Sequence, residues 1–360
     1  MIEVWVFWGI GYGFSAALLT SVFLVLTKRF HGTYTLDRNN GVQNVHRFAT
    51  PRCGGIALAV AYLTVWFFLS GEVRQIWGLI GLACTPALAF GLAEDITKKI
   101  SVRRRLIATI ASGLLFALIT GYAITRIDVR GVDVLLSFSL VSLAFTSFAV
   151  GGVANAINII DGFHGLASGT LIIILGAFAM IGARVGDLTL VSLALPMMAI
   201  VTGFFIVNFP HGKLFLGDGG AYFAGIFVAA LAVMLPARNP EVSPWISLLV
   251  LAYPVSETVV SAMRRLGGKA HGPGQADNAH LHHIVYRIWA PVVARVLDAH
   301  DHRNPVTSLV VWTLPLLSLV LATYVNLQSH VAIGYTGLSL VVYLLVYHGL
   351  RRRDTSETVG

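Results

Sequence analysis

The sequence predicts an all-α polytopic integral membrane protein, with a single membrane-embedded domain over residues 1–360. Apolar residues make up 56% of the chain and charged residues 12%, whereas a soluble domain carries about 25% charged residues. The mean hydropathy is +0.77, and several apolar runs are long enough to cross about 30 Å of hydrocarbon. These features exclude a disordered chain, a disulfide-rich secreted scaffold and a typical soluble enzyme. The two cysteines, Cys53 and Cys84, fit neither a metal motif nor a disulfide framework, so we expect free thiols.

Apolar runs predict about eleven transmembrane helices. In chain order they cover residues 4–26, 55–70, 76–93, 106–124, 134–153, 169–184, 189–207, 221–236, 246–263, 308–325 and 331–349. Three of these runs are shorter than a span requires, so we expect their helices to extend into the adjacent loops. The first run has no basic residue before it and is followed by Lys28 and Arg29, which argues against a cleaved signal peptide.

The distribution of basic residues predicts the orientation. If the N-terminus is periplasmic, 20 of the 25 Lys and Arg residues lie on the cytoplasmic side, as does the C-terminus. The predicted cytoplasmic loops are 27–54, 94–105, 154–168, 208–220 and 264–307. The polar, glycine-rich segments all fall in these loops, so we expect any active site on the cytoplasmic face. In a chain this apolar, the net charge of +8 indicates anionic lipid rather than nucleic acid.

The first two cytoplasmic loops contain candidate binding and acid–base groups. Thr50 and Arg52 flank a proline just before a glycine pair, which predicts a rigid turn and a close backbone approach at a helix start. Glu94 and Asp95 end an apolar run beside Lys98 and other cations. Acid pairs at a membrane boundary suggest Mg²⁺ binding or proton transfer, and an ion-paired helix end is the alternative.

The next two loops contain amides and carboxylates that suit a polar ligand. Asn155, Asn158 and Asp161 recur every three residues, so on a helix they fan over one face. Asp218 lies between glycines just before an apolar run. It is either a helix cap or a Mg²⁺ ligand that acts with the other acids and with substrate phosphates.

The long fifth loop contains His280, His282 and His283. A zinc site, contact with phosphate, and a surface cluster without a role are the alternatives, although the neighbouring residues form no recognisable zinc motif. Glu257 is the one acid placed well inside a predicted span, about two turns from its end, and we expect it to pair with Arg264 or Arg265.

In order and in combination, these five segments resemble the polyprenyl-phosphate N-acetylhexosamine-1-phosphate transferase superfamily, over about two-thirds of the chain from residue 51 to residue 283. The superfamily includes phospho-N-acetylmuramoyl-pentapeptide transferase and undecaprenyl-phosphate N-acetylglucosamine-1-phosphate transferases. The resemblance implies a bacterial inner-membrane enzyme that transfers a sugar 1-phosphate from a UDP-N-acetylhexosamine to polyprenyl phosphate and releases UMP. It also implies Mg²⁺, with Mn²⁺ as an alternative ion, membrane lipids as surroundings, no nucleic-acid partner, and either a monomer or a homodimer.

The resemblance also implies roles for individual residues. Asp218 matches the Mg²⁺ ligand, and Glu94 with Asp95 matches the paired aspartates that deprotonate or position the lipid phosphate. Catalytic or substrate-binding roles follow for Asp161, Thr50, Arg52, Lys98, Asn155, Asn158, His164, His280, His282 and His283.

Two residues depart from the family pattern. The first aspartate of the pair is Glu94 here, and the usual second acid after the Asp-Gly is His164.

Direct attack by the lipid phosphate is the expected mechanism, and an aspartyl-phosphate on Asp95 is the alternative. The resemblance leaves open whether the sugar is N-acetylglucosamine, N-acetylgalactosamine or a rarer N-acetylated sugar. It also leaves open whether the product enters O-antigen lipopolysaccharide, capsule, exopolysaccharide or a glycan for protein modification. A transporter or flippase of lipid-linked or anionic substrates is the competing function.

Overall fold

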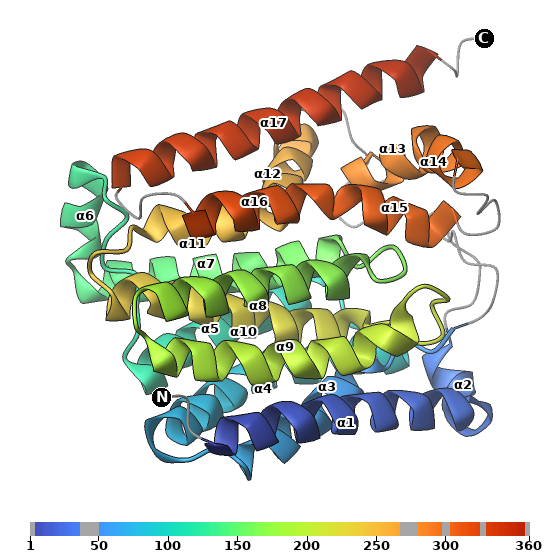
Figure 1. Cartoon of the computed structure of the whole chain (residues 1–360), viewed down its shortest axis with the longest axis horizontal. Coiled ribbons are helices and arrows are strands. Elements are labelled where there is room, and N and C mark those ends of the chain that lie inside the picture. Colours follow the sequence, from blue (N-terminus) through green and yellow to red (C-terminus); the bar gives the residue numbers. More distant parts are fainter. Residues whose placement is uncertain (1–3, 37–49, 267–278, 297–302, 325–328, 357–360) are drawn as a thin grey trace.

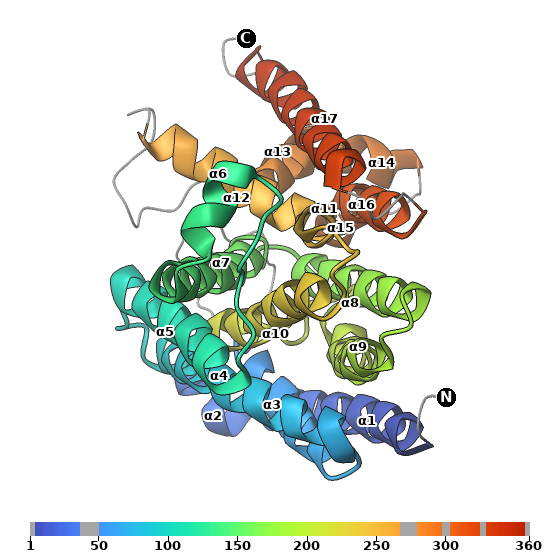
Figure 2. The same ribbon diagram turned by 90° about the vertical axis from the view of Figure 1, so that its left-hand side faces the viewer.

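The computed structural model describes residues 4–36, 50–266, 279–296, 303–324 and 329–356, and within these ranges it contains helices and no strand. Most helices run side by side along the long axis, with α1 and α17 at opposite edges (Figures 1 and 2). The helices are α1 (Val4–Leu26), α2 (Lys28–Thr35), α3 (Gly54–Trp66), α4 (Gly71–Thr97), α5 (Val102–Thr120), α6 (Arg130–Leu136), α7 (Ser139–Ile159), α8 (Leu166–Arg184), α9 (Leu188–Asn208), α10 (Gly217–Arg238), α11 (Pro244–Val250), α12 (Ala252–Leu266), α13 (Leu281–Ile288), α14 (Ala290–Val296), α15 (Arg303–Val311), α16 (Thr313–Tyr324) and α17 (Ser329–Ser356).

The membrane class predicted from composition is confirmed. Among the described residues, eight helices are long and apolar enough to span a membrane, or nine if the bent pair α11 and α12 forms one span. Each predicted run overlaps a helix, but α3 has only 13 residues and α5 begins with three arginines. Length and composition therefore support eight or nine spans, and the count of eleven stays a prediction. Large parts of the predicted loops 27–54 and 264–307 lie outside the described residues.

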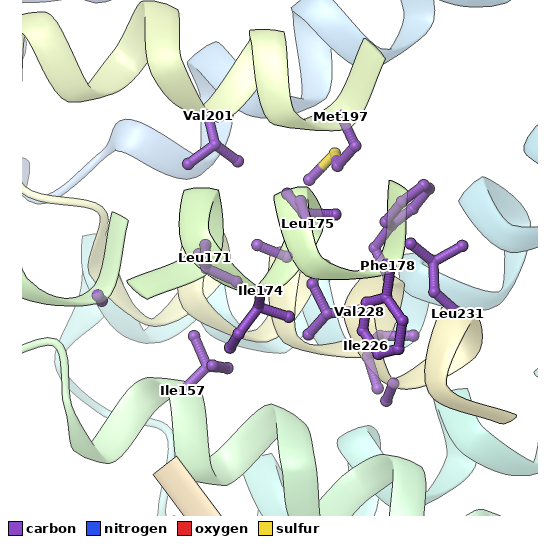
Figure 3. Close-up of a cluster of buried hydrophobic side chains, with 14 of the residues drawn as sticks. Ile157, Leu171, Ile174, Leu175, Phe178, Met197, Val201, Ile226, Val228 and Leu231 are labelled. Atoms are coloured by element: carbon purple, nitrogen blue, oxygen red, sulfur yellow. The ribbon is translucent and has the colours of Figure 1, made fainter. Parts of the chain in front are cut away.

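Helix α10 lies at the centre of the bundle, where it packs against α3, α4, α7 and α8 (Figure 2). Its sequence is apolar on every side, which is the pattern of a helix surrounded by protein. Figure 3 shows part of this core, in which Phe178 of α8 faces Ile226 and Leu231 of α10, and Met197 of α9 packs from the other side. The centre of the bundle thus fixes α10, and with it the residues at its first turn.

Glycines bring α3, α4 and α10 into backbone contact where α10 begins. A Cβ atom at Gly55 would lie 2.5 Å from the backbone nitrogen of Gly220, and one at Gly91 would lie 2.6 Å from the backbone nitrogen of Gly219. Larger side chains would push these helices apart. The glycine pair at the start of α3 therefore makes the close approach that the sequence predicts.

The other end of α10 is held by polar contacts. Arg238 bonds Asp187 (2.9 Å) and Glu72 (2.8 Å), which begin α9 and α4, and it also donates to the Tyr122 hydroxyl. Nearby, α7, α10 and α11 enclose an apolar cavity of about 270 Å³, whose lining includes Trp245.

The chain bends by 81° between α11 and α12. Helix α12 then leaves the bundle axis and packs against α7, α16 and α17, and α13 lies beside α17 in both views (Figures 1 and 2). This bend places Glu257, in the middle of α12, next to the segment that begins α13.

Candidate active site

Asp218 is the centre of the candidate site. It lies in the first turn of α10, after Gly217 (φ +73°), and it is 3% exposed. Its Oδ1 accepts hydrogen bonds from Asn158 Nδ2 (3.0 Å) and Arg52 Nη2 (3.1 Å), and its Oδ2 pairs with Arg105. One carboxylate therefore joins α10, α5, the end of α7 and the segment before α3.

Asp95 anchors the start of the same helix. Its side chain ends α4 and is fully buried, with its Oδ1 accepting from the backbone N–H of Asp218 and its Oδ2 from that of Gly219, both at 2.9 Å. The first N–H groups of a helix have no partner within the helix, and a negative charge stabilises that end. Arg52 Nε lies 3.7 Å from Asp95 Oδ1. Asp95 therefore holds in place the turn that carries Asp218.

Main-chain hydrogen bonds position Arg52. The Phe215 N–H donates to the Pro51 carbonyl, and the Gly54 N–H donates to the Phe215 carbonyl, each at 2.9 Å. The segment around Arg52 thus runs along the segment that leads into α10, which directs its guanidinium toward both carboxylates. Thr50, two residues earlier, is buried in the same segment.

Asn155 and Asn158, which the sequence predicts to share one polar face at the end of α7, contact different helices in the structure. Asn158 reaches Asp218, and its Oδ1 lies 3.5 Å from the Tyr222 hydroxyl. Asn155 instead donates to Thr109 Oγ1 (2.8 Å) on α5. Asn158 is therefore part of the site, and Asn155 joins α7 to α5.

Asp161 lies in the turn after α7 and next to the start of α10. Its pKa is raised to about 7, chiefly by burial and also by the charges of Asp218 and Asp95, while Arg52 and a backbone hydrogen bond from Gly217 oppose the rise. The site therefore brings three carboxylates together around one arginine.

Glu94 and Lys98 belong to the turn between α4 and α5. Glu94 Oε2 accepts the backbone N–H of Ile100 at 2.7 Å, and Lys98 is exposed and ends α4 in a left-handed conformation with φ 55°. Glu94 therefore stabilises the turn that delivers α5 and its Arg105 to the site.

His164 joins two neighbouring segments. Its backbone N–H donates to Asn304 Oδ1 (2.7 Å), and its Nδ1 lies 2.9 Å from the Pro210 carbonyl. Burial lowers the pKa of His164, the Pro210 contact opposes this, and His211 lowers it further. The imidazole is accordingly neutral near pH 7 and connects the turn after α7 to the loop before α10.

The three predicted histidines are buried beside the Asp161 turn. His282 and His283 pack edge-on against Phe163, with ring centroids 5.5 and 5.3 Å away, and His280 stacks on His282. Burial lowers the pKa of His282 well below its usual value, and the other two histidines add to this effect. Its Nδ1 is buried and has no hydrogen-bond partner in the described structure.

The expected pairing of Glu257 with Arg264 or Arg265 is wrong. Glu257 Oε1 lies 2.9 Å from His280 Nδ1, and its Oε2 accepts from the Tyr343 hydroxyl at 3.0 Å. The 81° bend turns α12 so that Glu257 meets α13 and α17, while Arg264 donates to a backbone carbonyl just before α13.

Sequence reasoning did not single out Arg105 or Tyr222 as site residues. Arg105 is the third of three consecutive arginines at the start of α5, and helical geometry turns at least one of three successive side chains toward the bundle. Tyr222 follows Asp218 by four residues, which is one helical turn.

The arrangement is compatible with Mg²⁺ but not with a closed metal cage. No group of three His, Cys, Asp or Glu side chains in the described ranges is placed to hold a metal ion. The carboxyl oxygens around this point are those of Asp218 and Asp161, while Asn158 presents its amide nitrogen to Asp218. Mg²⁺ commonly binds through one or two carboxylates together with substrate phosphates, so this donor set fits.

Comparisons with known proteins match the part of the chain that contains most of these residues. The family model described as glycosyl transferase family 4 matches residues 77–236, a range that includes Asp95, Asn158, Asp161 and Asp218. The chain is 27% identical over 247 residues to the probable undecaprenyl-phosphate N-acetylglucosaminyl 1-phosphate transferase of Bacillus subtilis, covering 67% of each chain. It is 28% identical over 240 residues to a phospho-N-acetylmuramoyl-pentapeptide-transferase of Streptococcus pneumoniae, covering 63% of this chain and 72% of the relative. With its apolar helices, the chain is a multi-pass protein of the bacterial inner membrane.

Proposed function

Since this chain is a homologue of the glycosyl transferase family 4 proteins, we propose that it transfers an N-acetylhexosamine 1-phosphate from a UDP-sugar to undecaprenyl phosphate. The reaction releases UMP and initiates a lipid-linked cell-surface glycan, such as the O-antigen of lipopolysaccharide. The observation that carries the proposal is the convergence of Asn158, Arg52 and Arg105 on Asp218 at the start of α10.

This arrangement suits two anionic substrates. Phosphoryl transfer depends mainly on positioning the reactants and on neutralising charge at the phosphate oxygens. Arg52 and Arg105 supply that charge, and the planar guanidinium group suits phosphate. In the structure both arginines pair with Asp218, so substrate phosphates would share or replace these pairings.

Asp218 would hold Mg²⁺, with Asp161 nearby. When bound, the ion would supply charge neutralisation at the diphosphate. To bind the ion, an Asp218 oxygen must offer a lone pair that accepts no hydrogen bond, or one of the two arginines must release the carboxylate.

The proposed step is a direct displacement. An oxygen of the lipid phosphate attacks the phosphorus that carries the sugar, a new P–O bond forms, and the bond from that phosphorus to the bridging oxygen breaks. The electron pair leaves with UMP. Asp95 is poorly placed for the alternative aspartyl-phosphate route, because it is fully buried and both its oxygens accept backbone hydrogen bonds from α10.

The proposed topology has eleven spans in one domain, with a periplasmic N-terminus, a cytoplasmic C-terminus and the site on the cytoplasmic face. Support comes from the concentration of basic residues in the loops that join these helix ends. UDP-sugars would then reach the site from the cytoplasm, while the lipid tail stays among the helices. A homodimer is compatible with this topology.

UMP release from the purified protein tests the proposal. A panel of UDP-N-acetylhexosamines is incubated with undecaprenyl phosphate, with Mg²⁺ and with a chelator. We expect release with one sugar, lost on chelation and in Asp218→Ala, but retained in the control Glu241→Ala, which changes an exposed acid beyond the other end of α10. Absence of UMP with every sugar, from folded wild-type protein, would overturn the proposal.

A transporter is the second candidate, favoured by the bend between α11 and α12 and the buried acid beside it. Broken helices with ionisable residues are common at transporter binding sites. Movement of an anionic lipid across proteoliposomes without UMP production would support this alternative.

A further inference from the structure

We propose that Glu257 is a positioning residue that fixes His280 in one tautomer and one orientation within the histidine cluster beside the Asp161 turn, with α17 completing the support. This inference rests on the proposed transferase function. It assigns a task to a buried acid and to a C-terminal helix that the Asp218 site does not use.

Three groups converge on the Glu257 carboxylate, which is 1% exposed. Oε1 accepts the backbone N–H of Leu281 at 3.0 Å and lies 2.9 Å from His280 Nδ1, and Oε2 accepts the Tyr343 hydroxyl at 3.0 Å. The Leu281 N–H is the first of α13, so Glu257 also satisfies an N–H that has no partner within the helix. Two of the contacts come from the start of α13 and the third comes from α17, so the carboxylate is held from two sides.

The residue before His280 is held from the same side. Arg264 Nη1 donates to the Ala279 carbonyl (2.9 Å) and to the Tyr347 hydroxyl (2.6 Å), and that hydroxyl donates to the same carbonyl (3.1 Å). Tyr343 and Tyr347 are one helical turn apart on α17 and both are buried. Helix α17 lies beside α13 in both views (Figures 1 and 2), so it fixes the backbone on both sides of His280.

The hydrogen-bond donors around Glu257 decide which nitrogen of His280 carries a hydrogen. The Leu281 N–H can only donate, and it bonds the same Oε1 that faces His280, so this oxygen serves as an acceptor and His280 Nδ1 carries the hydrogen. In the neutral ring the other nitrogen, Nε2, is then a hydrogen-bond acceptor. Carboxylates that orient an imidazole through Nδ1 are a general device in catalytic and metal sites. His280 also stacks on His282 (5.3 Å, 5°), which packs on Phe163 near Asp161, so its orientation sets that of the whole histidine cluster.

A double-mutant cycle tests whether Glu257 acts through His280. The variants are Glu257→Gln, His280→Gln and the double variant, compared by kcat and KM for UMP release. We expect Glu257→Gln to lower kcat about 10- to 100-fold, as for other residues that orient a ligand or catalytic histidine, with KM for the UDP-sugar nearly unchanged. The double variant should match His280→Gln within about twofold, because residues that act as one unit are not additive.

Two further variants control for folding. Tyr343→Phe removes one hydrogen bond to Glu257 and keeps the ring, so we expect a smaller fall in kcat in the same direction. Tyr253→Phe is the matched control, because this buried hydroxyl on α12 has no hydrogen-bond partner in the described residues, and we expect wild-type kinetics. If Glu257→Gln does not fold, the cycle is run with Tyr343→Phe in its place.

Nitrogen NMR of ¹⁵N-histidine-labelled protein gives a readout that does not depend on turnover. We expect a signal from a histidine protonated at Nδ1 that disappears in His280→Gln and changes its protonation pattern in Glu257→Gln. Multiplicative losses in the cycle, or an unchanged NMR pattern in Glu257→Gln, would overturn the inference. Wild-type protein that releases no UMP would instead overturn the proposed function, so the two failures are distinguishable.

Discussion

Replacing Asp95 with Asn separates a chemical role for this residue from a positioning role. The wild-type carboxylate accepts two backbone hydrogen bonds from the first turn of α10, each 2.9 Å long, one on each oxygen. In Asp95→Asn one oxygen still accepts, but the amide NH₂ faces the second N–H, and two donors cannot bond each other. The variant therefore leaves one buried N–H unsatisfied at the turn that carries Asp218.

The size of the effect follows from these bonds. Hydrogen bonds to a charged group contribute about 1.5–3 kcal/mol each, and a buried group left unsatisfied costs about 1–3 kcal/mol. One bond becomes neutral and the other is lost, so we expect Asp95→Asn to lower the free energy of unfolding by about 3 kcal/mol. At roughly 1.3 °C per kcal/mol for a chain of this size, the Tm should fall by about 4 °C.

The assay combines Tm in detergent with the kcat of UMP release. If Asp95 positions α10, Tm and kcat fall together in Asp95→Asn, and Asp95→Glu also loses Tm because the longer side chain does not fit the turn. If Asp95 is a nucleophile or a base, kcat collapses while Tm is unchanged, and this result would refute the positioning argument. Nearly full activity with an unchanged Tm would exclude both roles.

Three further predictions concern the same end of the bundle. Asp218→Asn should lower UMP release by at least about 1000-fold and should abolish the rise in Tm that Mg²⁺ gives the wild type, as measured by titrating Mg²⁺ during thermal unfolding. Gly55→Ala should lower Tm because its Cβ would meet the backbone of α10, whereas Gly152→Ala in α7, with open space around it, should raise stability by about 0.5–1 kcal/mol. Because burial raises the pKa of Asp161 from 3.8 to about 7, the folded state binds this proton more tightly than the unfolded state, and stability falls as pH rises from 4 to 7. Asp161→Asn should remove that slope in Tm between pH 5 and pH 7, and a slope equal to that of the wild type would contradict the assignment.

The sequence predicts the helices well because membrane spans are read from long apolar runs, and every predicted run overlaps a helix. It also predicts the role of the glycines at the start of α3, since a glycine pair beside a turn permits close backbone contact. The number of spans is harder to predict, because α3 is short and α5 begins with arginines that belong to the site.

Contacts between distant segments are harder to predict from the sequence. Helical periodicity places Asn155 and Asn158 on neighbouring faces, but only packing decides that one meets α5 and the other α10. The partner of Glu257 depends on the 81° bend. Pro254 marks the break, because its ring would clash with the Val250 carbonyl in a continuous helix, but it does not give the angle. Arg105 looks like one of several positive-inside charges until α4 and α10 bring Asp218 to it.

The central position of α10 also constrains how the protein is made. The backbone groups that satisfy Asp95 lie 123 and 124 residues further along the chain, and Arg52 precedes its partner Asp218 by 166 residues. During synthesis, α4 and α7 therefore enter the bilayer before these charged groups meet their partners. A nascent chain that stops before residue 217 should be recognised as incomplete by membrane quality control, because its acids and arginines remain unmatched in or beside hydrocarbon.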